Sequence, residues 1–206
     1  MTTTFPNPRA DRLRELLAGD DLLLSPCCYD ALSARMIEQA GFEMSFMSGF
    51  AASASRIGMP DLGLMSYGEV LDHTRNIAEA TRLPFVADGD TGYGGLLNVD
   101  MTVKEYERAG ASAIQLEDQV FPKKCGHTPN RPVVPKQEMA DKIRVAVEAR
   151  QSDDFLIIAR TDARSDQGLD EALDRMAAYD AAGADILFVE SPESEDELRL
   201  IGERFP

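Results

Sequence analysis

The feature that most constrains this chain is a repeating alternation of short apolar runs, polar or glycine-rich turns and amphipathic helical stretches. Its period is that of a βαβ unit, which needs roughly 30 residues or more. Because a helical stretch separates each apolar run from the next, the runs are predicted to form parallel strands. Six such strands are expected, at residues 21–25, 43–47, 84–87, 113–116, 155–159 and 185–189.

Two further patterns accompany this alternation. An Ala-Gly pair precedes several strands, at Gly41, Gly110 and Gly183, where glycine suits the left-handed residue that closes a helix. Polar and charged side chains follow the strands, at their carboxyl ends. Both a closed (β/α)8 barrel and an open doubly wound sheet place their sites there, so the residues alone leave both architectures open.

The length of 206 residues favours a single domain, residues 1–206. A barrel needs eight units and usually about 250 residues, whereas only one helical stretch follows the sixth strand. We favour an α/β fold of the (β/α)8 TIM-barrel type, with about six of the eight β/α units present in the sequence. An open sheet of six strands would leave two apolar edges unpaired, which disfavours it.

The formal net charge of −15 opposes binding to nucleic acid and to anionic membranes, since both would repel the chain. An anionic substrate would then need a local cluster of cations or a metal ion. The first residues have no apolar core of a signal peptide, so a cytoplasmic location is expected. Three cysteines, two of them adjacent, predict reduced thiols, and Cys27 and Cys28 are expected to be small buried hydrophobes.

An acidic cluster is expected where two neighbouring strands end. Asp88 and Asp90 flank a glycine after one strand, and on an extended segment they would face the same side. Glu117 ends the next strand, and Asp61 could join the cluster. Asp in a glycine-rich loop is often only a turn former. Repeated acidic strand ends repel one another unless a cation is present, and hard oxygen donors suit Mg²⁺, for which Mn²⁺ can substitute.

Cys125 lies in a polar loop with two lysines before it and a glycine and a histidine after it. Such a setting lowers the pKa of a thiol and favours a role as proton donor and acceptor. Arg160 follows a strongly apolar strand and carries a planar fork suited to a carboxylate. A structural pairing of Arg160 with Asp162 or Glu190 is the alternative.

The chain resembles the isocitrate lyase / phosphoenolpyruvate mutase superfamily in seven motifs that occur in the family's order. They are Ser48-Gly-Phe, Gly58-Met-Pro-Asp-Leu-Gly, Asp88-Gly-Asp-Thr-Gly-Tyr-Gly, Leu116-Glu-Asp-Gln, Lys123-Lys-Cys-Gly-His, Ile158-Ala-Arg-Thr-Asp-Ala and Ala184-Asp-Ile-Leu-Phe-Val-Glu. The resemblance runs from about Leu24 to the end of the sequence. It implies an α/β barrel, a homotetramer with a swapped terminal helix, bound Mg²⁺ and a small anionic carboxylate substrate.

The resemblance also implies roles for individual residues. Asp90 would bind the metal directly, and Asp61, Asp88 and Glu117 would hold it largely through water. Cys125 would be the catalytic acid, with Arg160 and Glu190 completing the catalytic groups. The expected substrate contacts are Ser48, Gly49, Phe50, Lys123, Lys124, Gly126, His127 and Arg160.

The cysteine motif is similar to that of the family's carbon–carbon lyases. It implies retro-aldol cleavage of a 2-hydroxy di- or tricarboxylate of the 2,3-dimethylmalate or 2-methylisocitrate type. Methylisocitrate lyases carry a tyrosine where this chain has Phe46, which disfavours that substrate. An oxaloacetate hydrolase, a phosphonopyruvate or phosphoenolpyruvate mutase-type enzyme, and a non-catalytic truncated barrel that acts as a binding or assembly subunit are the alternatives.

Overall fold

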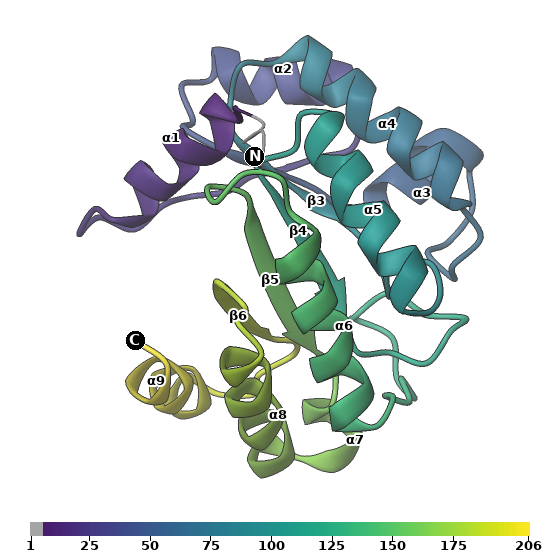
Figure 1. The fold of residues 1–206 in the computed structure, drawn as a ribbon, viewed down its shortest axis with the longest axis vertical. Helices are drawn as coiled ribbons and strands as arrows, with labels where there is room; N and C mark the ends of the chain where they lie inside the picture. The colour runs from purple at the N-terminus through teal and green to yellow at the C-terminus, as the bar shows by residue number, and fades with distance from the viewer. Residues whose placement is uncertain (1–5) are drawn as a thin grey trace.

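A computed structural model describes residues 6–206, which form one parallel sheet with helices between its strands (Figure 1). The sheet has six strands in the order of the sequence, each paired in parallel with the next. The strands are β1 (Cys27–Cys28), β2 (Ser45–Met47), β3 (Phe85–Asp88), β4 (Ala113–Glu117), β5 (Leu156–Thr161) and β6 (Ile186–Val189). This sequential parallel order is the topology of a TIM-type barrel.

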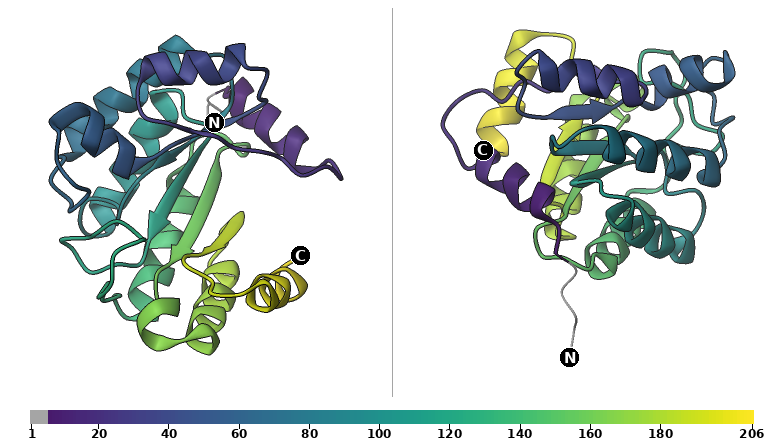
Figure 2. Two further views of the ribbon diagram at one scale, coloured as in Figure 1. Left: turned by 180° about the vertical axis from the view of Figure 1, so that it is seen from behind. Right: turned by 90° about the horizontal axis from the view of Figure 1, so that it is seen from above.

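Nine helices are defined within the described residues. They are α1 (Pro8–Leu17), α2 (Ala31–Gln39), α3 (Gly49–Ile57), α4 (Tyr67–Ala80), α5 (Leu96–Arg108), α6 (Lys136–Ala149), α7 (Arg164–Gln167), α8 (Leu169–Ala181) and α9 (Glu195–Arg204). In both views of Figure 2 the sheet is curved, and helices cover its convex side. None of the helices within residues 6–206 is long and apolar enough to cross a bilayer.

Local sequence signals explain where the helices begin and end. Asp30, Ser66 and Ser194 cap the first turns of α2, α4 and α9, where each side chain accepts a hydrogen bond from a free backbone N–H. The predicted glycines Gly41, Gly110 and Gly183 all have positive φ angles just beyond α2, α5 and α8. The Ala-Gly pairs therefore mark helix ends, as the sequence indicated.

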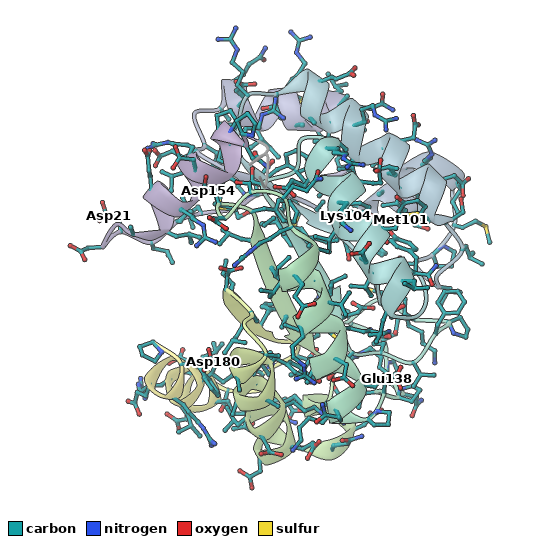
Figure 3. All side chains as sticks on the ribbon, in the orientation of Figure 1. Asp21, Met101, Lys104, Glu138, Asp154 and Asp180 are labelled. Carbon is teal, nitrogen blue, oxygen red and sulfur yellow. The ribbon has the colours of Figure 1, made fainter. Side chains whose placement is uncertain are left out.

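The prediction of a first strand at residues 21–25 is wrong. That run is an extended loop, and the two-residue β1 begins only at Cys27. Leu22 and Leu24 are largely exposed, and only Leu23 packs against the concave apolar cluster. Figure 3 shows Asp21 at the outer end of this loop, away from the sheet.

The two faces of the sheet bury different sets of side chains. The convex face packs against the helices through residues such as Phe85, Ile114 and Ile157. The concave face holds a smaller apolar cluster, in which Leu13 of α1 packs with Val86 and Ile158. Successive strand residues point to opposite faces, so one strand serves both cores.

The same alternation explains why the adjacent residues Cys27 and Cys28 differ in burial. Cys28 points to the helix side and is fully buried, as predicted, whereas Cys27 lines the concave face and is exposed. The expectation that Cys27 is a buried hydrophobe is wrong, because only one of two adjacent strand residues can face the helices.

Candidate active site

Three strands change from apolar to polar along their concave faces. Phe46 is followed by Ser48 after β2, Val86 by Asp88 in β3, and Ile158 by Arg160 in β5. Each pair is two residues apart and therefore shares a face. These polar positions lie at the carboxyl ends of the strands and line one pocket of about 450 Å³.

The pocket brings together most of the residues singled out in the sequence. It is lined by Ser48, Phe50, Asp61, Asp88, Glu117, Lys123, Lys124, Cys125, Gly126, His127, Arg160 and Glu190. Gly49 and Asp90 lie directly behind this lining, since each bonds to a residue of it. The motifs, which are spread over more than a hundred residues of sequence, thus meet at one end of the sheet.

The acidic cluster is held by a buried lysine. The Lys123 ammonium lies 2.5 Å from an Asp90 oxygen and 2.8 Å from an Asp61 oxygen, and its side chain is 2% exposed. Burial alone would lower the pKa of Lys123, but the surrounding carboxylates outweigh it and raise the pKa. Burial raises the pKa of Asp90 to about 6, against the pull of Lys123. The surrounding carboxylates therefore keep the Lys123 ammonium charged at neutral pH.

Asp88 and Asp90 do not lie on one extended segment. Asp88 ends β3, whereas Asp90 has a left-handed backbone with φ 48°. The Asp88 carboxylate accepts hydrogen bonds from the backbone N–H groups of Asp90 at 3.1 Å and Gly49 at 3.0 Å. A turn, and not the alternation of a strand, brings these carboxylates together.

Gly49 allows the closest of these approaches. A Cβ atom at this position would collide with the Asp88 carboxylate, so a larger residue would break the contact between α3 and β3. Ser48, just before it, caps α3 by accepting a bond from the Ala51 N–H, and Phe50 is half exposed at the pocket wall. The Ser-Gly-Phe motif is thus fitted against the acidic loop.

The donors in this cluster fit a divalent cation. Glu117 has one carboxylate oxygen, Oε1, that is buried without a hydrogen-bond partner. Burial raises the pKa of Glu117 well above its usual range although Arg160 and Lys123 oppose the shift. Within residues 6–206 no group of three or more His, Cys, Asp or Glu side chains is arranged to enclose an ion. Mg²⁺ needs only one or two direct carboxylates and keeps several waters, so this set fits it.

Arg160 is both paired and directed at the pocket. Its guanidinium donates to Asp162 at 2.9 and 3.0 Å, lies 3.1 Å from Glu190 and 3.6 Å from Glu117. Burial alone would lower the pKa of Arg160, but these carboxylates raise it, so the charge is permanent. The structural pairings considered from the sequence exist, and they hold the fork at the pocket wall.

The cysteine loop (residues 121–131) packs on this arginine. A Cβ atom at Gly126 would collide with the Arg160 guanidinium and lie 2.6 Å from the Glu190 carboxyl carbon. His127 is 3.9 Å from Glu190 with an exposed side chain. Lys124 donates to the Asn130 carbonyl at the surface, and the Cys125 thiol is partly buried. Glycine at 126 therefore lets the loop reach the strand ends.

Sequence reasoning missed several residues that support the site. Gln119 bonds to the cysteine loop, and Arg131 bonds to Asp162, the same carboxylate that holds Arg160. Asp118 accepts bonds from the Asp162 N–H and the Thr161 hydroxyl. Gln119 and Asp118 belong to the Leu116-Glu-Asp-Gln motif, which was the available signal. Arg131 carries no signal in the sequence.

A parallel α/β sheet of TIM-barrel type with its pocket at the strand ends defines the class of this protein. A family model described as phosphoenolpyruvate phosphomutase matches residues 13–206. The chain therefore belongs to the phosphoenolpyruvate mutase family of enzymes, within the isocitrate lyase / phosphoenolpyruvate mutase superfamily.

Three known proteins illustrate the relationship. The 2,3-dimethylmalate lyase of Eubacterium barkeri is 49% identical over 96% of this chain and 68% of its own length. Oxaloacetate acetylhydrolase in complex with the inhibitor 3,3-difluorooxalacetate superposes with a TM-score of 0.93 at 37% identity, covering 97% of this chain and 69% of that chain. Phosphonopyruvate hydrolase in complex with oxalate and Mg²⁺ has a TM-score of 0.86 at 37% identity, covering 96% of this chain and 69% of that chain. This chain thus spans about two thirds of each relative.

Proposed function

We propose that this protein is a Mg²⁺-dependent carbon–carbon lyase that cleaves a small 2-hydroxy dicarboxylate of the 2,3-dimethylmalate type, with Cys125 as the acid. The observation that carries the proposal is one pocket lined by a thiol, an arginine and an acidic cluster. The similarity to 2,3-dimethylmalate lyase supports the reaction class and the substrate type.

The chain's own residues divide the work of binding. Arg160 offers a permanent positive charge to a substrate carboxylate, and its fork suits a two-point contact. Gly126 and His127 lie beside it on the same wall, and Ser48 lies on another part of the pocket. A dicarboxylate can therefore be held at one end by the arginine side and at the other by the acidic side with its cation.

Asp90 would hold Mg²⁺ directly, and Asp61, Asp88 and Glu117 would hold it through water. When bound, the cation supplies positive charge that stabilises negative charge on a substrate oxygen. Lys123 pairs with Asp61 and Asp90 and so reduces the repulsion among these carboxylates, whether or not the cation is bound.

Cleavage requires two proton movements that the pocket must serve. The 2-hydroxyl proton leaves to water or to a pocket carboxylate, the C–O bond becomes a carbonyl, and the C2–C3 bond breaks with its electrons passing to C3. The Cys125 thiol then donates a proton to C3, which completes the second acid, and the thiolate regains a proton before the next turnover. This step is general acid catalysis by a group in a cationic loop.

The direct test is turnover of 2,3-dimethylmalate by the purified protein with Mg²⁺, compared with a Cys125→Ser variant. We expect the variant to lose at least about tenfold in kcat, equivalent to about 1.4 kcal/mol on the barrier. A variant that keeps nearly the full rate would rule out the cysteine as acid. A folded sample without metal-dependent turnover on any substrate of this class would favour the binding-subunit alternative.

Oxaloacetate hydrolysis is the second candidate, favoured by the superposition on oxaloacetate acetylhydrolase. The same pocket would hold oxaloacetate, which also carries two carboxylates and a central oxygen beside the bond to be broken. An assay of oxaloacetate against 2,3-dimethylmalate at equal concentrations separates the two. The larger kcat/KM identifies the substrate, since this ratio measures transition-state stabilisation.

A further inference from the structure

The loop that carries Cys125 is closed at its base by the chain itself. Val120 donates to the Pro132 carbonyl and Val134 to the Asp118 carbonyl, both at 2.8 Å, and Gln119 forms an antiparallel bridge with Val133. This base fixes where the loop starts and ends. It leaves the middle of the loop, which includes Cys125, to be held by other contacts.

The Gln119 side chain supplies such a contact. Its amide nitrogen donates to the Lys124 carbonyl and its amide oxygen accepts from the Lys124 N–H, both at 2.9 Å. Only this orientation of the amide satisfies both partners, because a flipped amide would face donor to donor and acceptor to acceptor. Gln119 is 2% exposed, so water competes little for these bonds.

The residue that follows Lys124 is held from another direction. The Cys125 N–H donates to the Asp61 carbonyl at 3.0 Å, and the Cys125 carbonyl accepts from the Thr128 N–H and hydroxyl. Both backbone groups of Lys124 are thus fixed by Gln119, and both backbone groups of Cys125 by its neighbours. The position of the Sγ atom depends on all of these bonds.

We propose that Gln119 is a positioning residue that clamps the Lys124 backbone and thereby sets the place of the Cys125 thiol in the pocket; the catalytic consequence rests on the proposed function above. Gln119 does not line the pocket, so it acts through the loop and not on the substrate. Displacement of a catalytic group by about 1 Å can cost on the order of 100-fold in rate. If Gln119 only satisfied the hydrogen bonds of a tight turn, its replacement would leave the Cys125 thiol in place.

The test uses Gln119→Met, which removes both bonds at similar length, and Gln119→Glu, which sets a carboxylate oxygen against the Lys124 carbonyl. Alkylation by iodoacetamide is followed at each cysteine by mass spectrometry. We expect alkylation of Cys125 to become at least about tenfold faster while that of Cys27 stays within about twofold. Global unfolding would instead expose Cys28 as well, because that thiol is fully buried.

Steady-state kinetics complete the test. For Gln119→Met and Gln119→Glu we expect kcat to fall at least about tenfold. KM should change less than about threefold, since Arg160 is untouched. The matched control is Gln137→Met, the same substitution at an exposed glutamine of α6, which should change neither readout. The proposal would be overturned if alkylation of Cys125 were unchanged in both Gln119→Met and Gln119→Glu. It would also be overturned if alkylation became faster while these variants kept the full kcat. If Cys125→Ser itself keeps full activity, the role of Cys125 as the acid fails and kcat no longer reports on Gln119, while the alkylation ratio still decides whether Gln119 holds Cys125.

Discussion

At the scale of single residues, the site depends on close approaches that only glycine permits. Gly49 lies against the Asp88 carboxylate and Gly126 against the Arg160 and Glu190 side chains. Neither glycine has a positive φ, so the backbone itself would accept another residue. What excludes a larger residue is the space that the Asp88, Arg160 and Glu190 side chains occupy.

Gly126→Ala should therefore impair activity more than stability. The new methyl group would push the cysteine loop away from Glu190 and Arg160, and we expect kcat/KM to fall at least about tenfold. The matched control is Gly68→Ala in α4, where a Cβ atom meets nothing within 4 Å. That variant should keep full activity and gain up to about 1 kcal/mol of stability, since alanine is the better helix former. Equal kinetics of the two variants would contradict the crowding argument.

At the scale of elements, two contacts tie segments together in ways that can be measured. His73 of α4 is 6% exposed, and its Nε2 lies 2.8 Å from the Tyr29 carbonyl just before α2. Burial lowers the pKa of His73, and the bond to Tyr29 only partly offsets it. The folded protein thus favours a neutral imidazole that joins α4 to the start of α2.

This depressed pKa predicts a loss of stability in mild acid. Below about pH 6.5 the unfolded chain binds a proton at His73 that the folded protein does not, so the unfolding free energy falls as pH falls, by at most about 1.4 kcal/mol per pH unit. The loss ends at the lower pKa of the folded state. Urea unfolding of His73→Gln between pH 7.5 and 5.5 should show a shallower decline than wild type. A decline of His73→Gln as steep as that of wild type would contradict this assignment.

Arg131 joins the cysteine loop to the ends of two strands. It is 3% exposed, and its guanidinium donates to the Thr128 carbonyl, to Asp162 at 2.9 Å and to the Ser165 hydroxyl at 2.6 Å. Ser191, beyond β6, is 3.5 Å away. The loop, β5 and β6 thus share one buried cation.

Replacement of the Arg131 guanidinium should destabilise the folded protein. Arg131→Met leaves the Asp162 carboxylate with only Arg160 as a charged partner, and we expect a loss of roughly 3–5 kcal/mol in the free energy of urea unfolding. The exposed pair of Arg144 with Asp141 provides the control, and Arg144→Met should cost at most about 1 kcal/mol. Similar losses in both variants would show that burial of the Arg131 pair adds nothing.

These elements also show how far sequence reasoning reaches. Strands β2 to β6 were predicted because each is an apolar run between helices, and β3, β4 and β5 are buried along their whole length. A local pattern can therefore report the tertiary environment. The run at 21–25 is similarly apolar but pairs with no strand within residues 6–206, and its Leu22 and Leu24 stay exposed. Most of the site followed from motifs at strand ends, whereas Arg131 is defined by partners more than 30 residues away in sequence, Asp162 and Ser165, and no local pattern reveals such contacts.

At the scale of the whole molecule, charge and the proposed cation are linked. The chain carries a net charge of −15, and several carboxylates converge on one pocket. Binding of a divalent cation to the folded state alone stabilises it by mass action, by about 2.7 kcal/mol at a concentration 100 times Kd. Screening by salt also relieves repulsion among distant charges, so the two effects must be separated.

Titration with MgCl2 should raise the melting temperature more than KCl at equal ionic strength. Asp90→Asn should abolish this excess, because the proposed direct ligand is lost, and should leave the response to KCl unchanged. Asp100→Asn, at a partly exposed carboxylate of α5 that pairs with Lys104, is the control and should keep the full Mg²⁺ response. Identical curves for the two salts in the wild-type protein would contradict the proposed metal site.

The two-residue alternation of the strands has a consequence for how such a protein tolerates change. Because the face that carries Asp88, Glu117 and Arg160 is also the face that packs against α1, the ionic groups and the concave core occupy alternate positions of the same strands. Insertion of a single residue within a strand would turn the ionic groups beyond it toward the helices and apolar groups toward the pocket. Insertions and deletions should therefore survive selection only in the turns, while exchanges of side chain at strand ends can alter the chemistry and leave the fold intact.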